Sequence, residues 1–228
     1  MPELVGKIEV EKKSLASFAD PHEMYAFALA HVLTHRKKEF ERSLASVKEA
    51  AKIDIPEHWF MREYLWVVYV SGFKAERITA KYDQLLQLHK IEDADHQYVP
   101  IRFDNLLLYD ENLRPVYKVF ANRKKAKAIQ RVREEIQTRG WKEFYADYVK
   151  ARDPVQLDRL PNIGPALACH LARNFGNLAV CKPDVHLNRL AEHFGYETPT
   201  KLLQVVSETP IGQTDLVLWM ASQDLGTR

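Results

Sequence analysis

Apolar residues recur at helical spacing along most of the chain. Pro21 begins a helix that continues to about Lys52 and is expected to contain a break, and Pro56 begins a second helix that ends near Gly72. A third helix is expected over 75–90, with its apolar residues along one face. These patterns, and a total of only 8 glycines, predict a mostly α protein with about eight helices.

The helical pattern lapses over residues 91–121. Two apolar runs, 106–109 and 116–120, flank the polar stretch 110–115, which is an arrangement typical of strand, turn and strand. We therefore expect a small β-hairpin insertion within an otherwise helical chain. Helical spacing then resumes and continues to about residue 151.

The stretch 160–195 contains two helices with clear start and stop signals. Pro165 stands at a first-turn position of the first helix, where a missing N–H costs nothing, and Gly176 ends that helix. Asp184 is the expected N-cap of the second helix, which ends at Gly195. Two capped helices therefore flank a short link.

The composition is that of a globular protein. Of the 228 residues 46% are hydrophobic, enough for one domain or two small lobes packed together. The two cysteines, Cys169 and Cys181, are too few for a disulfide framework or an iron–sulfur cluster. No apolar run approaches the roughly 20 residues that span a bilayer, and the N-terminus lacks the apolar core of a signal peptide. We expect an intracellular protein that binds no membrane.

Positive charge is concentrated in one part of the chain. The formal net charge is only +2, but residues 121–190 hold 14 Lys and Arg against 7 Asp and Glu. Arg123, Lys124, Lys125 and Lys127 stand together at the start of a predicted helix. They could follow a nucleic-acid backbone, although such a run is also typical of a solvated helix face.

The turn Leu160–Gly164 combines an apolar residue, Ile163, with residues that tolerate left-handed backbone angles, Asn162 and Gly164. A turn of this kind at the start of a helix leaves backbone N–H groups unpaired, at the positive end of the helix dipole. The sequence therefore predicts a phosphate-binding turn around Gly164 to Ala166.

These residues resemble a known DNA-binding motif, the helix-hairpin-helix. The segment after the motif narrows the likeness to the helix-hairpin-helix-GPD superfamily of base-excision DNA glycosylases, in a variant without the iron–sulfur cluster. The resemblance covers roughly Pro56 to the C-terminus, apart from the insertion. It is carried by Leu160-Pro161-Asn162-Ile163-Gly164, Lys182-Pro183-Asp184-Val185-His186, Asn122 to Ile129, Ser71-Gly72-Phe73 and Asp215 to Trp219.

The resemblance implies the architecture and the partner. It implies a single glycosylase-like domain over 1–228 with two helical lobes, in which 158–195 holds the hairpin and the catalytic segment. The implied partner is double-stranded DNA with a damaged or modified base, bound by a monomer, in the cytoplasm with the nucleoid or in the nucleus. The implied reaction is hydrolysis of the bond between the base and its sugar.

The family's catalytic Asp corresponds to Asp184. Breaking the bond between base and deoxyribose develops positive charge on the sugar, and a fixed carboxylate in a water-poor pocket stabilises that charge. It can also orient or deprotonate the attacking water. Alone, an Asp at this position would more commonly be a helix cap, worth about 1 kcal/mol. The hairpin ahead of it favours the catalytic interpretation.

Family members that also cut the DNA strand carry a lysine two residues after the second hairpin glycine. Ala166 occupies that position here and cannot form a Schiff base. We therefore expect a monofunctional glycosylase that uses water. Lys182, close to Asp184 in sequence, is an alternative amine for the attack on the sugar, but a solvated or phosphate-binding lysine is the simpler interpretation.

The resemblance also places contacts with DNA. Asn162, Gly164, Pro165 and Ala166 would hold one phosphate, and Lys182 and His186 would add contacts, although His186 could equally be a helix-surface residue. No cofactor is required by this interpretation. The hairpin is also a candidate site for a monovalent or alkaline-earth cation, bound by the main-chain carbonyls of Asp158, Leu160 and Ile163.

Base extrusion commonly uses a side chain that fills the gap in the duplex. Phe73 is the candidate wedge, with burial in the core as the alternative. Aromatic residues for a pocket wall, most of them expected in the core first, are Trp59, Phe60, Tyr64, Trp66 and Tyr69.

Two other functions stay open on the sequence. One is a non-catalytic protein that binds damaged or branched DNA through the hairpin, and the other is a bifunctional glycosylase with an unconventional lysine. The Asp-Val-His triplet leans toward oxidised purines, but that branch normally keeps the lysine that Ala166 replaces. The sequence therefore leaves the excised base undecided.

Overall fold

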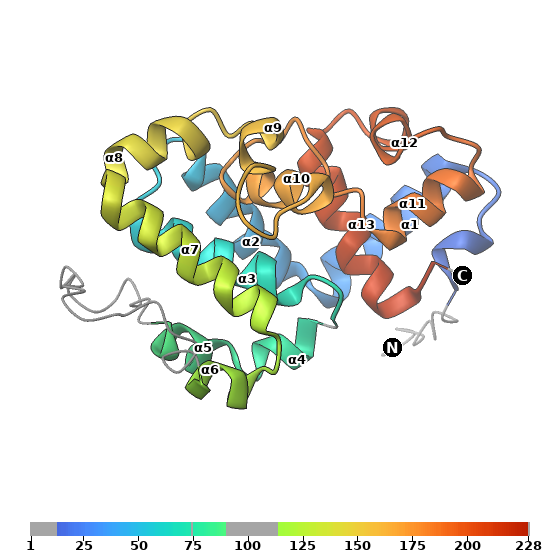
Figure 1. Cartoon of the computed structure of the whole chain (residues 1–228). Helices are drawn as coiled ribbons and strands as arrows, with labels where there is room; N and C mark the ends of the chain where they lie inside the picture. The colour runs from blue at the N-terminus through green and yellow to red at the C-terminus, as the bar shows by residue number, and fades with distance from the viewer. Residues whose placement is uncertain (1–12, 74, 90–113, 228) are drawn as a thin grey trace, which may run out of the picture. The chain divides into compact units, whose positions relative to one another are not determined.

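The computed structural model of the protein describes residues 13–73, 75–89 and 114–227. The predicted mostly α fold is confirmed, and no strand occurs within the described residues (Figure 1). A short 3₁₀ turn, Leu15–Ser17, and a π-helical turn, Tyr145–Val149, complement the α-helices. The α-helices are α1 (Pro21–His35), α2 (Lys37–Ala50), α3 (Glu57–Val70), α4 (Ala75–Thr79), α5 (Tyr82–Leu88), α6 (Arg114–Val119), α7 (Arg123–Arg139), α8 (Trp141–Phe144), α9 (Pro154–Leu157), α10 (Pro165–Asn174), α11 (Val185–His193), α12 (Pro199–Val206) and α13 (Ile211–Leu225).

The chain divides into two compact units. One unit is Ser46–Val180, and the other combines Met1–Ala45 with Cys181–Arg228. Each unit has its own apolar core. The boundary at Val180 falls inside the segment 158–195, so the hairpin belongs to the first unit and Asp184 to the second.

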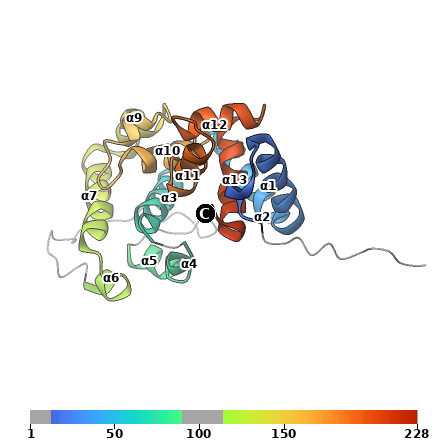
Figure 2. The ribbon, with the colours of Figure 1, turned by 90° about the vertical axis from the view of Figure 1, so that its right-hand side faces the viewer.

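The unit Ser46–Val180 is built around α3. This helix is apolar on almost every face, because α4, α5, α7 and α10 all contact it. Phe60 is fully buried and packs against the rings of Tyr64, Trp141, Phe144 and Phe175. The short helices α4, α5 and α6 lie together at one end of α3 and α7 (Figures 1 and 2).

The predicted strand at 116–120 is wrong, since this stretch forms most of α6. Pro115 stands in the first turn of α6, where its missing N–H leaves no bond unmade. The N–H of Phe120 donates to the carbonyl of Val116 at 2.8 Å and closes a helical turn, and the Val116 side chain is buried. Burial therefore overrides the local β propensity. The other predicted strand, 106–109, lies outside the described residues.

The single helix predicted over 75–90 is two helices, α4 and α5. Between them the N–H of Lys81 donates to the carbonyl of Ile78 at 2.9 Å in a tight turn. Directly after the turn, the Tyr82 hydroxyl donates to the carbonyl of Arg62 on α3 at 3.0 Å. The break therefore lets α5 pack against α3, which the spacing of apolar residues did not reveal.

Arg152 closes the end of α2 that belongs to this unit. Its guanidinium donates to the carbonyls of Ala50, Ala51 and Ile53 at 2.8, 3.1 and 2.7 Å. The last carbonyls of a helix have no partner within the helix, so a side chain from elsewhere satisfies them. Arg152 itself has a positive φ of 51°.

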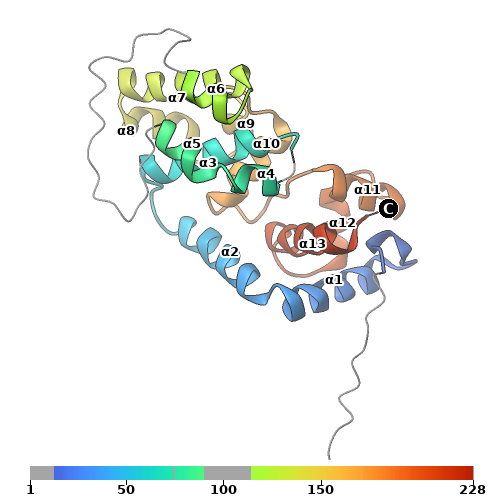
Figure 3. The ribbon, with the colours of Figure 1, turned by 90° about the horizontal axis from the view of Figure 1, so that it is seen from below.

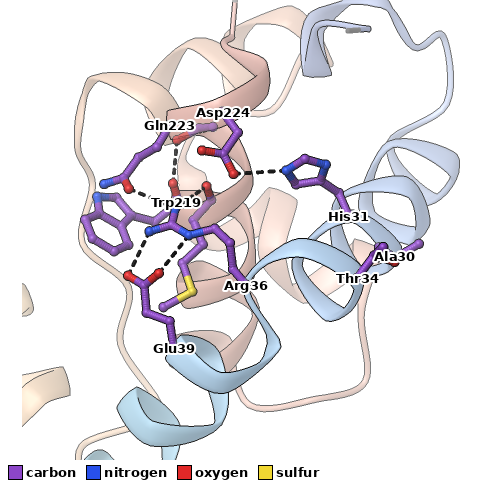
Figure 4. A network of polar contacts seen from close by, with 10 residues as sticks. Ala30, His31, Thr34, Arg36, Glu39, Trp219, Gln223 and Asp224 are labelled. Carbon is purple, nitrogen blue, oxygen red and sulfur yellow. Dashed lines mark hydrogen bonds and ion pairs between the residues drawn. The ribbon is translucent and has the colours of Figure 1, made fainter. Parts of the chain in front are cut away.

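The second unit packs α1, α11 and α12 against α13, and Figure 3 shows α1 alongside α13. The predicted break in the first long helix is confirmed at Arg36. The Arg36 guanidinium donates to both carboxylate oxygens of Glu39 at 2.7 and 2.9 Å, and to the Met220 carbonyl and the Gln223 side chain on α13 at 2.8 and 2.9 Å (Figure 4). A kink at Arg36 thus fastens α1 and α2 to α13.

Helix α12 was not predicted from the sequence, although its start carries the usual signals. The Thr198 side chain accepts a hydrogen bond from the Lys201 N–H, and Pro199 stands in the first turn. No helix in the described parts of the chain combines the length and the apolar character that crossing a membrane requires.

Candidate functional site

The predicted turn Leu160–Gly164 joins α9 to α10 as a tight hairpin. Asn162 has a φ of 59°, in the left-handed region that the sequence predicted for it. The N–H of Ile163 donates to the carbonyl of Leu160 at 3.1 Å, and both side chains are buried. The apolar residues of the turn therefore anchor it in the core, while its backbone forms the entry to α10.

Gly164 differs from the sequence expectation. It is the N-cap of α10 with φ −124° and ψ 178°, an extended conformation that any residue adopts, rather than a left-handed one. A Cβ added at Gly164 would meet no atom within 4 Å. Neither backbone conformation nor packing against the described residues therefore requires a glycine here, and a residue without a side chain leaves room for another molecule to approach the backbone.

No side chain caps α10. Pro165 has no N–H, and the first-turn amides after it have no carbonyl partner within the helix. Helices α1, α7, α9, α11 and α12 begin with a side-chain cap, whereas α3, α5, α8 and α13 begin without one, so it is the open glycine in an extended conformation that distinguishes the start of α10. The start of α10 therefore offers backbone N–H groups beside a glycine whose Cβ side is open.

The hairpin is held from behind by α3. The hydroxyl of Tyr64, which is fully buried, donates to the carbonyl of Pro161 at 2.5 Å, and burial raises the pKa of this phenol. At the other end of α10, the Asn174 amide donates to the carboxylate of Glu63 at 2.8 Å. Burial raises the pKa of Glu63. Two polar contacts from α3 therefore fix both the start and the end of this segment.

Asp184 caps α11, as predicted. Its Oδ1 accepts hydrogen bonds from the N–H groups of His186 and Leu187 at 2.9 and 3.1 Å. Its Oδ2 lies 3.8 Å from Nζ of Lys182, and the Asp184 side chain is 13% exposed. One oxygen thus fixes the carboxylate to the helix, and the second oxygen faces a cation at the edge of solvent.

The chain around Asp184 is fixed by α13. The Lys182 N–H donates to Oδ2 of Asp215 at 2.9 Å, and Asp215 is 1% exposed. In the sequence, Asp215 was only one end of a segment that carries the family resemblance, and nothing in local spacing indicated this contact. His186 is half-buried, and its Nδ1 shares a hydrogen bond of 3.2 Å with the Thr227 hydroxyl. His186 therefore also helps to anchor the C-terminal residues.

Phe73, the predicted wedge, lies in the turn after α3 and is 38% exposed. Gly72 before it has a φ of 76°, which turns the chain sharply. The Phe73 ring meets the ring of Phe120 edge-on at a centroid distance of 5.0 Å. The side chain is therefore partly supported and partly presented to solvent.

Lys125 does not lie on the surface of α7, contrary to the proposed run of phosphate contacts. It is 6% exposed and its Nζ contacts the end of α3. Arg123, Lys124 and Lys127 are exposed, as that interpretation requires. Lys125 precedes the buried Ile129, Val132 and Ile136 by 4, 7 and 11 residues, so helical spacing places it on the buried face of α7, and this signal was missed because the four cations were treated as one run.

The aromatic residues named for a pocket wall belong first to the core. Phe60, Tyr64 and Tyr69 are fully buried, whereas Trp59 and Trp66 are half-buried. The Tyr69 hydroxyl shares a hydrogen bond of 2.9 Å with Nε2 of His89, and burial lowers the pKa of that imidazole to about 3.

The hairpin atoms and Asp184 offer different chemistry. The hairpin presents N–H donors suited to an anion, and Asp184 presents a fixed carboxylate. The carbonyl of Leu160 already accepts one hydrogen bond, and the main-chain cation site at Asp158, Leu160 and Ile163 stays a prediction.

Comparison with protein-family models, curated proteins and solved structures finds no match for this chain.

Proposed function

We propose that this protein is a monofunctional DNA glycosylase that extrudes a damaged or modified base from duplex DNA and hydrolyses its bond to deoxyribose. The observation that carries the proposal is a tight hairpin with an open glycine and an uncapped helix start, followed after 18 residues, from Ala166 to Asp184, by a carboxylate fixed at the next helix. The same two segments carry the resemblance to the helix-hairpin-helix-GPD superfamily, and the backbone conformation at the start of each helix is now known.

The hairpin suits binding to a DNA phosphate. Backbone N–H groups at the start of α10 and the positive end of its dipole favour an anion, and Gly164 lets the phosphate approach. Such contacts fix the position of the duplex without reading its sequence. Arg123, Lys124 and Lys127, exposed on α7, add positive charge to the same unit.

Asp184 suits the chemical step. As the bond between C1′ and the base breaks, the base leaves with the electron pair and positive charge develops on the sugar, which the carboxylate stabilises. The oxygen of a water molecule then bonds to C1′, and the proton that water loses passes to the carboxylate and from there to the released base anion, which restores the ionised carboxylate. Fixation of Oδ1 by two backbone N–H groups keeps the carboxylate in place throughout.

The proposal predicts an abasic site and no strand cleavage. Ala166 cannot attack the sugar, whereas Lys182 would leave a Schiff base that borohydride reduces to a covalent adduct. The test incubates the protein with duplexes that each hold one lesion, among them oxidised purines, alkylated purines, uracil and mismatched thymine. Alkali-dependent cleavage of one duplex is the expected result, and a borohydride-trapped adduct would instead indicate the bifunctional enzyme.

One observation favours a second function, a non-catalytic protein that binds damaged or branched DNA. The two hydrogen bonds that Asp184 accepts are those of an ordinary helix cap. Binding to lesion or branched duplexes without release of any base from the panel would support this function and contradict the glycosylase.

Gly164→Ala is predicted to weaken DNA binding without weakening the fold. The backbone conformation accepts alanine and the added Cβ meets no atom within 4 Å, so the free energy of unfolding should stay within about 1 kcal/mol of wild type. The methyl group would occupy the approach of the phosphate, and loss of one charge-assisted hydrogen bond lowers affinity about tenfold. Titration of a labelled duplex and urea unfolding check the two halves, and unchanged affinity would contradict the phosphate-binding turn.

A further inference from the structure

Lys125 makes an unusual set of contacts for a lysine in the first turn of a helix. Its Nζ donates to the carbonyls of Val68, Tyr69 and Ser71 at 2.6, 3.2 and 2.5 Å, and lies 3.1 Å from the Ser71 hydroxyl. These oxygens belong to the end of α3 and the turn after it. We call this set of contacts the Lys125 clamp. Burial lowers the pKa of Lys125 to about 8, so the amine is still mostly protonated at neutral pH.

The clamp places the charge against the preference of its own helix. Lys125 is the third residue of α7, where the positive end of the dipole disfavours a cation. At the end of α3, by contrast, the orphan carbonyls favour one. The neighbours Lys124 and Lys127 point to solvent. Lys125 is thus directed at the end of α3 by specific contacts that compensate its place in α7.

The clamp ends at the turn that carries Phe73. Ser71 supplies two of the four oxygens, and Gly72 turns the chain at a φ of 76°. The Phe73 N–H donates to the carbonyl of Val70 at 3.0 Å. Nζ of Lys125 lies 5.0 Å from the centroid of the Phe73 ring. The ammonium therefore holds the backbone before the ring and also faces the ring itself.

We infer that Lys125 is a positioning residue that holds the Ser71–Phe73 turn, so that the half-exposed Phe73 ring is presented to DNA as a wedge. This inference rests on the proposed function. A ring held in place before binding loses less conformational freedom when it enters the gap left by a base, so the clamp should strengthen binding to DNA that has such a gap. A clamp that served only to cap α3 would stabilise the unit and leave this preference unchanged.

The test compares two duplexes of the same sequence, one with a tetrahydrofuran abasic-site analogue and one undamaged. The measured quantity is the ratio of their dissociation constants. Stacking of an aromatic side chain on bases predicts that Phe73→Ala lowers the preference for the abasic duplex about tenfold. Lys125→Met should lower it by a similar factor, and the double variant should lose no more than either single variant. Lys142→Met is the matched control, since it removes the same charge from an exposed lysine of the same unit that has no place in the proposed DNA contacts, and it should keep the ratio.

The outcomes separate the inference from the proposed function. A wild type that prefers the abasic duplex and a folded Lys125→Met variant that keeps this preference, with only a lower melting temperature, overturn the inference. Lys125→Gln, which removes the charge and shortens the side chain but stays polar, replaces the methionine variant if that variant does not fold, and full retention of the preference in the glutamine variant also overturns the inference. If the wild-type protein shows no preference for the abasic duplex, the inference is also overturned. Base release from the lesion panel decides the proposed function independently.

Discussion

Asp184→Asn is expected to slow base release by about two to three orders of magnitude while the protein keeps its fold. Asparagine is as good an N-cap as aspartate, so its side-chain oxygen can still accept from the N–H groups of His186 and Leu187. The negative charge that stabilises the sugar and accepts the proton of water is lost. Removal of one such electrostatic contact commonly costs about 100-fold to 1,000-fold in rate.

The measurement is single-turnover base release on the duplex that the lesion panel identifies, together with thermal unfolding. Asp20→Asn is the matched control, because Asp20 caps α1 in the same unit through one bond from the Glu23 N–H at 2.9 Å. It should leave the rate unchanged. Asp184→Ala should lose both the rate and about 1 kcal/mol of stability. A folded Asp184→Asn protein with a near wild-type rate would leave Asp184 as a cap alone.

Helix ends were the part of the fold that the sequence predicted best, because their causes are local. Pro21, Pro165 and Asp184 all mark the helix starts that their residue types indicate. Contacts from distant residues escaped prediction. Arg152 caps a helix that ends about 100 residues earlier, and Arg36 reaches α13, so neither role leaves a trace in local spacing.

The site shows the same division. Asn162 takes the left-handed conformation that its residue type indicated, and Gly164 does not, because its backbone is extended and its Cβ side is open. The run from Arg123 to Lys127 contains one buried and three exposed cations. A charge pattern gives the number of positive side chains but not which of them the end of a neighbouring helix will bind. Lys125 was therefore expected among the exposed phosphate contacts, although its ammonium is buried against the end of α3.

Gly176→Ala is expected to be the most destabilising of these substitutions. Gly176 ends α10 in a Schellman motif. The N–H of Gly176 donates to the carbonyl of Arg173, and the N–H of Asn177 donates to the carbonyl of Ala172, both at 2.9 Å. Its φ is 100°, and a Cβ would lie 2.4 Å from both Cα and N of Ala51. Alanine therefore combines left-handed strain with a backbone clash, and we expect a loss of about 4 kcal/mol.

Gly195→Ala separates the two contributions. Gly195 ends α11 with the same pair of hydrogen bonds, from its own N–H to the carbonyl of Glu192 and from the N–H of Tyr196 to that of Ala191, and has a φ of 72°. A Cβ there meets no atom within 4 Å, so only the conformational penalty of about 1–2 kcal/mol applies. Urea unfolding compares the two variants. Ala51→Gly should not rescue Gly176→Ala, because the atoms closest to the new methyl group are backbone atoms that remain in the double variant. If the two alanine variants lose the same free energy of unfolding, or if Ala51→Gly restores the stability of Gly176→Ala, the prediction is wrong. The backbone at Ala51 then moves to make room for the new methyl group.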